Sequence, residues 1–488
     1  MPLILSGNVA SATAPTTYDV ANSCRFNDGD DPYMQKTPGS AGNRDRWTFS
    51  CWFKRGTLSS VSGVSQYIFT QSKTSSIYAL IGFNTSDQIN FDNQNSGDIG
   101  QLVTARKLRD CSAWYHLTVI WDSANGTAGD RYQIWINGVR ETVFATNTGV
   151  DSGEDSMMNR DDTPMSIGAV AWAGTSWSNE FDGYLAECVF IDGLALAPTS
   201  FGEFDSDSPA IWKPIDVSGL TFGTNGFYLD FEASDNLGND VNGGTDLTEA
   251  NLAAVDQATD TPTNNFCVLN PIDNSISNWT FLGEGNLEVQ GNTTGGDYVG
   301  PSGTIGLTAG KWYWEGKLVT SAGAGSDIIG VTGTLPEDDG HQTGYYVDGY
   351  SYVNDGGTVN NASHSASWGA TYDDDDIISV ALDLTNLSIY FAKNGTWQDS
   401  GDPTSGATGT GEAYTVLAPA LTKAGAYFPQ VSEWSSAGQG TWQFNFGGCP
   451  AFAITSAQSD DNNLGKFEYD PPANFLSICS SNLGSTGG

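Results

Sequence analysis

The chain has 488 residues, enough for two to four domains that each bury a core. It carries 57 acidic and 19 basic residues, a net charge of −38, so its surface repels nucleic-acid phosphates and anionic membranes. There is no run of eighteen apolar residues, and MPLILSGNVASATA lacks the features of a secretory signal. We therefore expect a globular protein with no nucleic-acid partner and no membrane insertion.

Residues 1–20 begin with a short apolar segment and continue with small and polar residues. Leu3, Ile4 and Leu5 make up the apolar segment and are the candidate anchor for assembly. Such a segment is expected either to dock as an arm on a neighbouring subunit or to stay a disordered tail. The pattern favours neither alternative.

Residues 21–232 are predicted to form many short strands separated by Gly, Asn and Asp turns. Apolar and polar residues alternate in WTFSCWFKR (47–55), as they do in a strand with one face on a core. Further strands are expected at 114–122, 131–138, 165–170 and 184–192, with one helical turn at 198–205. Short strands with frequent turns predict a β-sandwich or jelly roll.

Residues 233–283 are interpreted as a connector between two domains. Just before it, GFYLDFE (226–232) is expected to add an edge strand to the first sandwich. The polar stretch 234–244 is predicted to be a surface loop, because its oxygen side chains lack the spacing of an EF-hand. A Pro- and Asn-rich bridge, 260–271, follows.

Residues 284–488 are expected to form a second antiparallel sandwich with a C-terminal extension. Its central feature is the stretch 372–396, which predicts two strands with one buried face and a tight turn at Asn394-Gly395. The four consecutive Asp residues before it predict a solvated loop. Apolar residues within 466–483 predict that the tail packs on this domain.

Catalytic motifs are absent from the sequence, and we expect no enzyme. The chain has three histidines without metal spacing, no nucleophile elbow and no phosphate loop. Glu187 is a lone carboxylate in a predicted strand, whereas glycoside hydrolysis needs a pair. The seven cysteines form no CxxC pair and are expected to be small buried thiols of a reduced protein. No cofactor is implied, although calcium on loop carboxylates is an alternative to plain solubility.

Two loops combine aromatic rings with polar side chains, the combination that stacks on sugar rings and bonds their hydroxyls. Such loops at the ends of sandwiches are common recognition sites. The loop 170–181 contributes the candidate ligand contacts Trp172, Trp177 and Asn179, and the loop 338–352 contributes Tyr345, Tyr346 and Tyr350. With 15 tryptophans in the chain, packing in a core is the alternative role for each of them.

The first sandwich resembles the concanavalin A-like, laminin-G-like domains. The resemblance rests on CRFNDGDD (24–31), WTFSCW (47–52), WYHLTV (114–119) and FDGYLAE (181–187). Ala186 stands where many members have Asp, so a calcium ligand is not carried over at that position. This superfamily includes glycan hydrolases, which leaves a carbohydrate-active enzyme with unrecognised carboxylates as an alternative function.

The second sandwich resembles the SPRY domains. The resemblance rests on KWYWE (311–315), IIGV (328–331), the hairpin 372–396, YFPQV (427–431) and FNFG (444–447), which occur in the family's order. The fold class expected for the whole chain is therefore all-β, with two tandem antiparallel jelly-roll sandwiches. An intracellular adaptor that binds peptides through the SPRY-like loops is the third candidate function.

This tandem, its connector and its closing segment are similar to virion proteins of tailed phages, especially marine ones. The similarity includes GFYLDF, LGND and TPTNNF in the connector and FEY near the C-terminus. It implies a fibre, spike or head-decoration protein that is assembled in the bacterial cytoplasm and released by lysis. The implied partners are other virion proteins, a host-surface glycan and further copies of the chain, with a trimer as one possibility.

Overall fold

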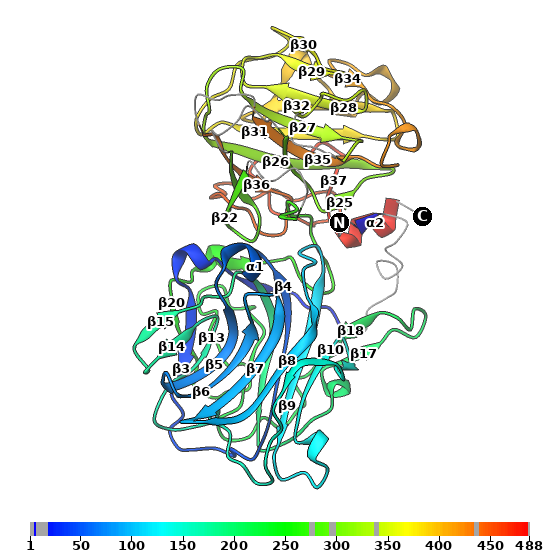
Figure 1. Cartoon of the computed structure of the whole chain (residues 1–488). Coiled ribbons are helices and arrows are strands. Elements are labelled where there is room, and N and C mark those ends of the chain that lie inside the picture. The colour runs from blue at the N-terminus through cyan, green and yellow to red at the C-terminus, as the bar shows by residue number, and fades with distance from the viewer. Residues whose placement is uncertain are drawn as a thin grey trace. The chain divides into compact units, whose positions relative to one another are not determined.

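The computed structural model divides the chain into two compact units, each of which is described by itself (Figure 1). The N-terminal unit comprises residues 15–263, and the C-terminal unit comprises residues 264–488 together with residues 1–14. The structure describes residues 4–5, 18–272, 279–291, 299–335, 341–433 and 439–486.

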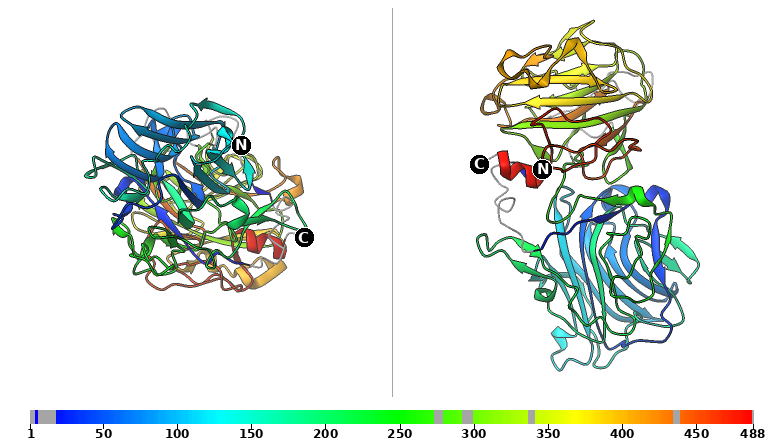
Figure 2. Two further views of the ribbon diagram at one scale, coloured as in Figure 1. Left: turned by 90° about the horizontal axis from the view of Figure 1, so that it is seen from below. Right: turned by 180° about the vertical axis from the view of Figure 1, so that it is seen from behind.

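The N-terminal unit is a sandwich of two eight-stranded, antiparallel sheets (Figures 1 and 2). One sheet has the spatial order β11 (Val139–Arg140), β10 (Tyr132–Ile136), β9 (Trp114–Asp122), β4 (Arg46–Arg55), β16 (Gly183–Asp192), β2 (Ser23–Phe26) and β21 (Gln257–Ala258). Its eighth strand, β19 (Phe227–Leu229), pairs with β16 outside this order. The facing sheet has the order β12 (Phe144–Asn147), β8 (Asp98–Lys107), β7 (Gln88–Asn95), β6 (Ile77–Phe83), β5 (Gln66–Thr74), β13 (Met165–Ile167), β3 (Tyr33–Lys36) and β20 (Thr248–Ala250).

The core of this unit lies between the two sheets and is rich in aromatic rings. Because successive side chains of a strand point to opposite faces, alternate residues of β4 enter this core. One of them, Phe49, stacks on Phe69 of β5 with ring centroids 4.5 Å apart, which joins the two sheets directly. Burial of such rings is the main source of stability in a sandwich.

Short elements complete the N-terminal unit outside the two sheets. Two hairpins are formed by β14 (Val170–Trp172) with β15 (Ser176–Ser178) and by β17 (Gly202–Phe204) with β18 (Trp212–Pro214). The short helix α1 spans Ser59–Ser62, and 3-10 turns lie at Asp28–Asp30, Ala128–Asp130, Pro198–Ser200 and Ala254–Asp256. The turn at Pro198–Ser200 falls where the sequence predicts a single helical turn.

The boundary of the first sandwich lies beyond the predicted one. The edge strand expected at 226–232 is confirmed, because β19 pairs antiparallel with β16. However, residues 233–263, predicted to be connector, contribute β20 and β21 to the two sheets. These strands are two or three residues long, which is too short to show a hydrophobic alternation in the sequence.

The C-terminal unit is a second sandwich, with one sheet of nine strands and one of six. The larger sheet contains β22 (Trp279–Gly283), β23 (Glu288–Gly291), β36 (Thr441–Asn445), β26 (Lys311–Thr320), β31 (Ile377–Asp383), β32 (Ser388–Lys393) and β33 (Thr396–Trp397), with β34 (Tyr414–Thr415) beside β32 and β37 (Leu476–Ser477) beside β26. The smaller sheet has the order β24 (Val299–Ser302), β35 (Phe428–Glu433), β27 (Asp327–Thr332), β28 (Gly349–Val353), β29 (Thr358–Asn360) and β30 (Ser363–Ser365).

The predicted hairpin is present as β31 and β32, and Asn394 and Gly395 adopt the positive φ angles of its second turn. The expectation of a single buried face is wrong. Ala381 and Tyr390, on the face away from the main core, are also buried, because Phe467 and Phe475 of the C-terminal extension cover them. The prediction that the tail packs on this domain is therefore confirmed.

A fully buried carboxylate fixes this tail to the sheet. Glu315 of β26 accepts hydrogen bonds from the backbone N–H groups of Glu468 and Tyr469, at 3.0 and 2.8 Å. It also accepts from the Tyr313 hydroxyl at 2.9 Å and from the Asn445 amide at 3.0 Å. The extension ends in helix α2 (Ser480–Thr486).

The N-terminal segment pairs within the C-terminal unit. The two-residue strand β1 (Ile4–Leu5) runs parallel to β25 (Ile305–Gly306), so these two candidate anchor residues form an intramolecular ladder. The third, Leu3, lies outside the described residues. Among the residues that the structure describes, no helix is long and apolar enough to cross a membrane.

All seven cysteines carry buried thiols, which confirms that expectation. Cys24, Cys51 and Cys188 lie within the core of the N-terminal unit, on strands that are neighbours in one sheet. They act as small apolar side chains in this position.

Candidate functional site

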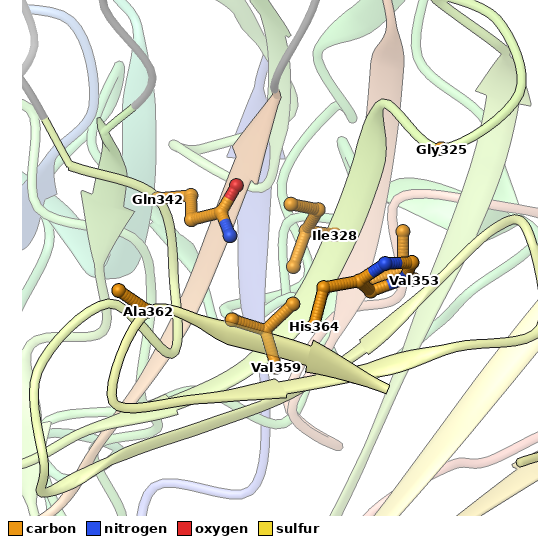
Figure 3. A pocket seen from close by; sticks show the side chains of 7 residues that line it. All are labelled: Gly325, Ile328, Gln342, Val353, Val359, Ala362 and His364. Carbon is orange, nitrogen blue, oxygen red and sulfur yellow. The ribbon is translucent and has the colours of Figure 1, made fainter. Parts of the chain in front are cut away.

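A pocket of about 280 Å³ lies on the outer face of the six-stranded sheet of the C-terminal unit (Figure 3). Its apolar wall is formed by Ile328 of β27, Val353 of β28 and Val359 of β29, which make a small cluster of their own. Since β-strand side chains alternate, Ile329 points into the core while Ile328 points into the pocket.

Polar groups border this apolar wall on two sides. Figure 3 shows the Gln342 amide and the His364 ring on either side of the Ile328 and Val359 side chains. His364 Nε2 lies 3.2 Å from Asp355 Oδ2, so a protonated imidazole forms an ion pair at the rim. An apolar wall with a few polar groups at its edge is typical of sites that bind small groups or side chains.

The predicted aromatic loop 338–352 forms one border of this pocket, through Gln342. His341 stacks on Tyr345 with ring centroids 3.6 Å apart, and Tyr346 meets both rings edge-on. The backbone of Tyr346 accepts a hydrogen bond from Asn361, which ties the loop to the β29–β30 turn. Tyr345 and Tyr346 are half-buried and stay candidate ligand contacts.

Tyr350 differs from the other two predicted tyrosines of this loop. It lies on β28, is 3% exposed and packs in the main core. Its hydroxyl accepts a hydrogen bond from the backbone N–H of Leu417 at 3.1 Å. The alternation of β28 points this side chain inward, so it offers no ring face to a ligand, and its assignment as a ligand contact is wrong.

The second predicted aromatic loop, in the N-terminal unit, is the hairpin β14–β15. Trp172 packs edge-on against Tyr78, whereas Trp177 stacks on Tyr33 at 3.5 Å between ring centroids. Ala171 is the partner of Trp177, so Trp172 and Trp177 project from opposite faces of the hairpin and do not converge. Asn179 has a positive φ and donates to the carbonyl of Ser65, which gives it a structural role.

Glu187 occupies a β-bulge in the middle of β16. The register against β4 shifts between Ala186 and Val189, and Glu187 has a φ of 50°. Its Oε2 accepts hydrogen bonds from the hydroxyls of Tyr18 at 3.0 Å and Tyr228 at 2.8 Å. Burial raises the pKa of this carboxyl to about 7. The two tyrosines come from segments far from Glu187 in the sequence, so the sequence alone does not identify them as its hydrogen-bond partners.

Two buried carboxyl groups, Asp327 and Glu433, form a pair in the C-terminal unit that no sequence motif indicates. The two residues are direct partners on β27 and β35, and both carboxylates point toward Gly440. Asp327 accepts from Ser321 and Asn354, whereas Glu433 Oε1 is buried and has no hydrogen-bond partner among the described residues. Burial, together with the charge of Asp327, raises the pKa of Glu433 to about 8.

This pair predicts that the free energy of unfolding decreases as the pH rises from mildly acidic to mildly basic values. The folded pKa of Glu433 lies above its unfolded value, so its contribution is complete below about pH 4.5 and is lost as pH rises toward 8. We expect Glu433→Gln, which mimics the neutral form, to stabilise the chain at pH 8 by roughly 1–3 kcal/mol and to flatten this pH dependence. Urea unfolding at pH 5 and pH 8 measures the stabilisation and the pH dependence, with Glu412→Gln as the control. Identical pH slopes for variant and wild type would contradict the prediction.

No group of three or more His, Cys, Asp or Glu side chains in the described ranges is arranged to hold a metal ion. Several carboxylates of the N-terminal unit form ion pairs with Arg or Lys instead, as Asp87 does with Arg109 at 2.7 Å. Calcium on the loops therefore stays a prediction from the sequence.

Two family models match the sequence. Residues 28–198 match the concanavalin A-like lectin/glucanases superfamily (Laminin_G_3), and residues 311–428 match the SPRY domain. The chain therefore contains a concanavalin A-like domain followed by a SPRY domain, in a tandem of β-sandwiches. Domains of both kinds are generally binding modules. A search of curated proteins gives no significant match.

Solved structures give similarities at low identity. The SPRY domain of human HERC1 is 19% identical, with 34% of this chain and 90% of that chain covered and a TM-score of 0.25. A candidate carbohydrate-binding protein from Bacteroides ovatus is 15% identical, with 48% and 58% covered and a TM-score of 0.34. The heptameric SAP-like pentraxin from Limulus polyphemus is 14% identical, with 37% and 80% covered and a TM-score of 0.26.

Proposed function

We propose that this chain is a non-catalytic adhesive and structural protein of a phage particle, which binds host-surface carbohydrate through its concanavalin A-like domain. The binding role is supported by one observation: the buried carboxylates have structural positions and do not face a pocket. Glu187 and Glu315 accept structural hydrogen bonds within the sandwiches, and neither they nor the pair Asp327 and Glu433 line a described pocket. A hydrolase needs two carboxyl groups that reach one substrate bond.

Three further features support a virion protein. The net charge of −38 suits solubility in a salty medium, and seven buried thiols suit folding in a reducing bacterial cytoplasm. The tandem and its connector are similar to proteins of tailed phages.

The test of this proposal uses purified phage particles from a culture that carries the sequence. We expect mass spectrometry to find the chain as a stoichiometric component, and labelled antibodies to locate it on the head or the tail. The purified protein is expected to bind glycans on an array without releasing reducing ends. Absence from the particles would refute the virion role, and hydrolysis that stops in Glu187→Gln would favour an enzyme instead.

A second candidate function, peptide binding by the SPRY domain, is favoured by the pocket of Figure 3. Its apolar wall and the His364–Asp355 rim suit an apolar side chain that is followed by a polar group. Selection from a peptide display library tests this function, with Val359→Asp as the variant that should lose binding. Selection of the same peptides by wild type and variant would exclude this pocket as their site.

A further inference from the structure

We propose that a cavity at the open edge of the N-terminal unit binds one neutral pyranose ring of a glycan. This inference rests on the proposed carbohydrate binding and names its site. The cavity has a volume of about 230 Å³ and lies where the edge strands of the two sheets meet. Strands β10 and β11 lie at the edge of one sheet here, and β12 is the edge strand of the other.

The inner wall of the cavity is apolar and rigid. It is formed by Leu102 of β8, the ring of Tyr132 of β10 and the half-buried ring of Phe144 of β12. The Tyr132 hydroxyl donates to Asn147 at 2.9 Å and accepts from the backbone N–H of Gly149 at 2.9 Å. These bonds fix the buried Tyr132 ring as the floor of the cavity, and the half-buried ring of Phe144 is the face open to the C–H groups of a sugar.

The rim carries planar polar side chains that are already oriented. Gln133 accepts from the Trp135 indole at 2.9 Å and donates to the Asp130 carbonyl at 3.0 Å. Arg140 donates to the Asp130 carboxylate at 2.6 Å. Preorganised amide and guanidinium groups are suited to fixing ring hydroxyls because little side-chain entropy is lost on binding.

Charge at the rim favours a neutral ligand. Arg140 is paired with Asp130, and Glu141 lies 3.1 Å from Arg106, so the charged groups at the rim occur as pairs of opposite sign. Glu141 is 7% exposed, and its Oε1 is the atom that lies 3.1 Å from Arg106, so this carboxylate is already engaged by a guanidinium.

Size and surroundings limit the ligand further. The cavity is smaller than the roughly 300–1,000 Å³ of sites for drug-sized ligands, which suits a single ring. A second cavity of about 490 Å³ shares Ala128 and Gly149 with the first and can take the next unit of the glycan. The carboxylates of Asp98, Asp151 and Glu154 outnumber the guanidinium of Arg131 in the lining of this second cavity and disfavour sialylated or sulfated sugars.

Glycan binding by the full-length protein and its variants tests the site. We expect wild type to bind neutral glycans on an array, and to bind sialylated or sulfated glycans more weakly. Phe144→Ala removes the stacking face and should raise the Kd for the best-bound neutral glycan about tenfold, measured by calorimetry. Val143→Ala is the matched control, since Val143 is 66% exposed and does not line the cavity. Gln133→Ala is a second variant from the opposite wall, expected to weaken binding several-fold without loss of a core contact.

The outcomes separate this inference from the proposed function. If wild type binds a neutral glycan and both cavity variants bind it as tightly as wild type, the site is wrong while carbohydrate binding stands. If wild type binds only anionic glycans, the charge argument fails and the site is overturned. If wild type binds no glycan at all, the proposed carbohydrate binding fails, and this site fails with it.

Discussion

Replacement of Glu315 by alanine is expected to lower the free energy of unfolding of the C-terminal unit by roughly 3–5 kcal/mol. The carboxylate is fully buried, and its removal leaves the Glu468 and Tyr469 backbone N–H groups without their acceptor. The Asn445 amide loses a bond as well. Urea unfolding of the full chain, followed by tryptophan fluorescence, measures the loss.

Limited proteolysis gives a second readout of this variant. The tail is held by Glu315 and by Phe467 and Phe475, so loss of the carboxylate should expose residues 451–486 to protease before the rest of the unit unfolds. Glu315→Gln keeps one acceptor oxygen and the shape of the side chain, and is expected to lose less than half as much stability. Equal stability of wild type and Glu315→Ala would show that the tail is held by its apolar contacts alone.

Replacement of Arg55 by methionine is expected to destabilise the N-terminal unit by about 3–5 kcal/mol, because it leaves buried acceptors unpaired. Arg55 is fully buried on β4 and donates to the Leu108 carbonyl at 3.0 Å and to Gln66 at 3.0 Å. Its guanidinium lies 3.6 Å from Asp87 and 3.8 Å from the centre of the Phe83 ring. Chemical denaturation at constant pH measures the change.

Arg109 provides the matched control for this variant. It contacts the same carboxylate, Asp87, at 2.7 Å, but its side chain is 46% exposed. When Arg109 is replaced, the buried Asp87 keeps Arg55 and the Ser60 N–H as partners, and the Arg109 guanidinium is partly solvated, so Arg109→Met should lose clearly less stability than Arg55→Met. If both variants lose the same stability, burial of the guanidinium is not what makes Arg55 important.

The overall fold was predictable because strand alternation and turn residues are local signals. The hairpin β31–β32, the edge strand β19 and the buried thiols all follow from short segments of sequence. The second buried face of the hairpin was not predictable, since Phe467 and Phe475, far along the chain, cover it. Apolar pattern alone does not tell which distant segment packs on a face.

The candidate site was harder to predict than the fold, for a physical reason. A pocket depends on which side chains converge from different strands, and Ile328, Val353 and Val359 have no spacing that reveals this. Aromatic content identified the loop of Tyr345 and Tyr346 beside the pocket, but it also selected Tyr350, which packs in the core. The pair of Asp327 and Glu433 depends on strand register, which the sequence does not specify.

The pairing of β1 with β25 has a consequence for synthesis on the ribosome. Ile4 emerges first, but its partner Ile305 emerges only after the whole N-terminal unit has been made. The bridge between Phe266 and Cys479 likewise joins the start of the C-terminal unit to its last turns. Domains generally fold as units during translation. The N-terminal unit can therefore fold before the C-terminal unit has been synthesised, whereas the SPRY-containing unit can complete its pairing only after residue 479 has left the ribosome.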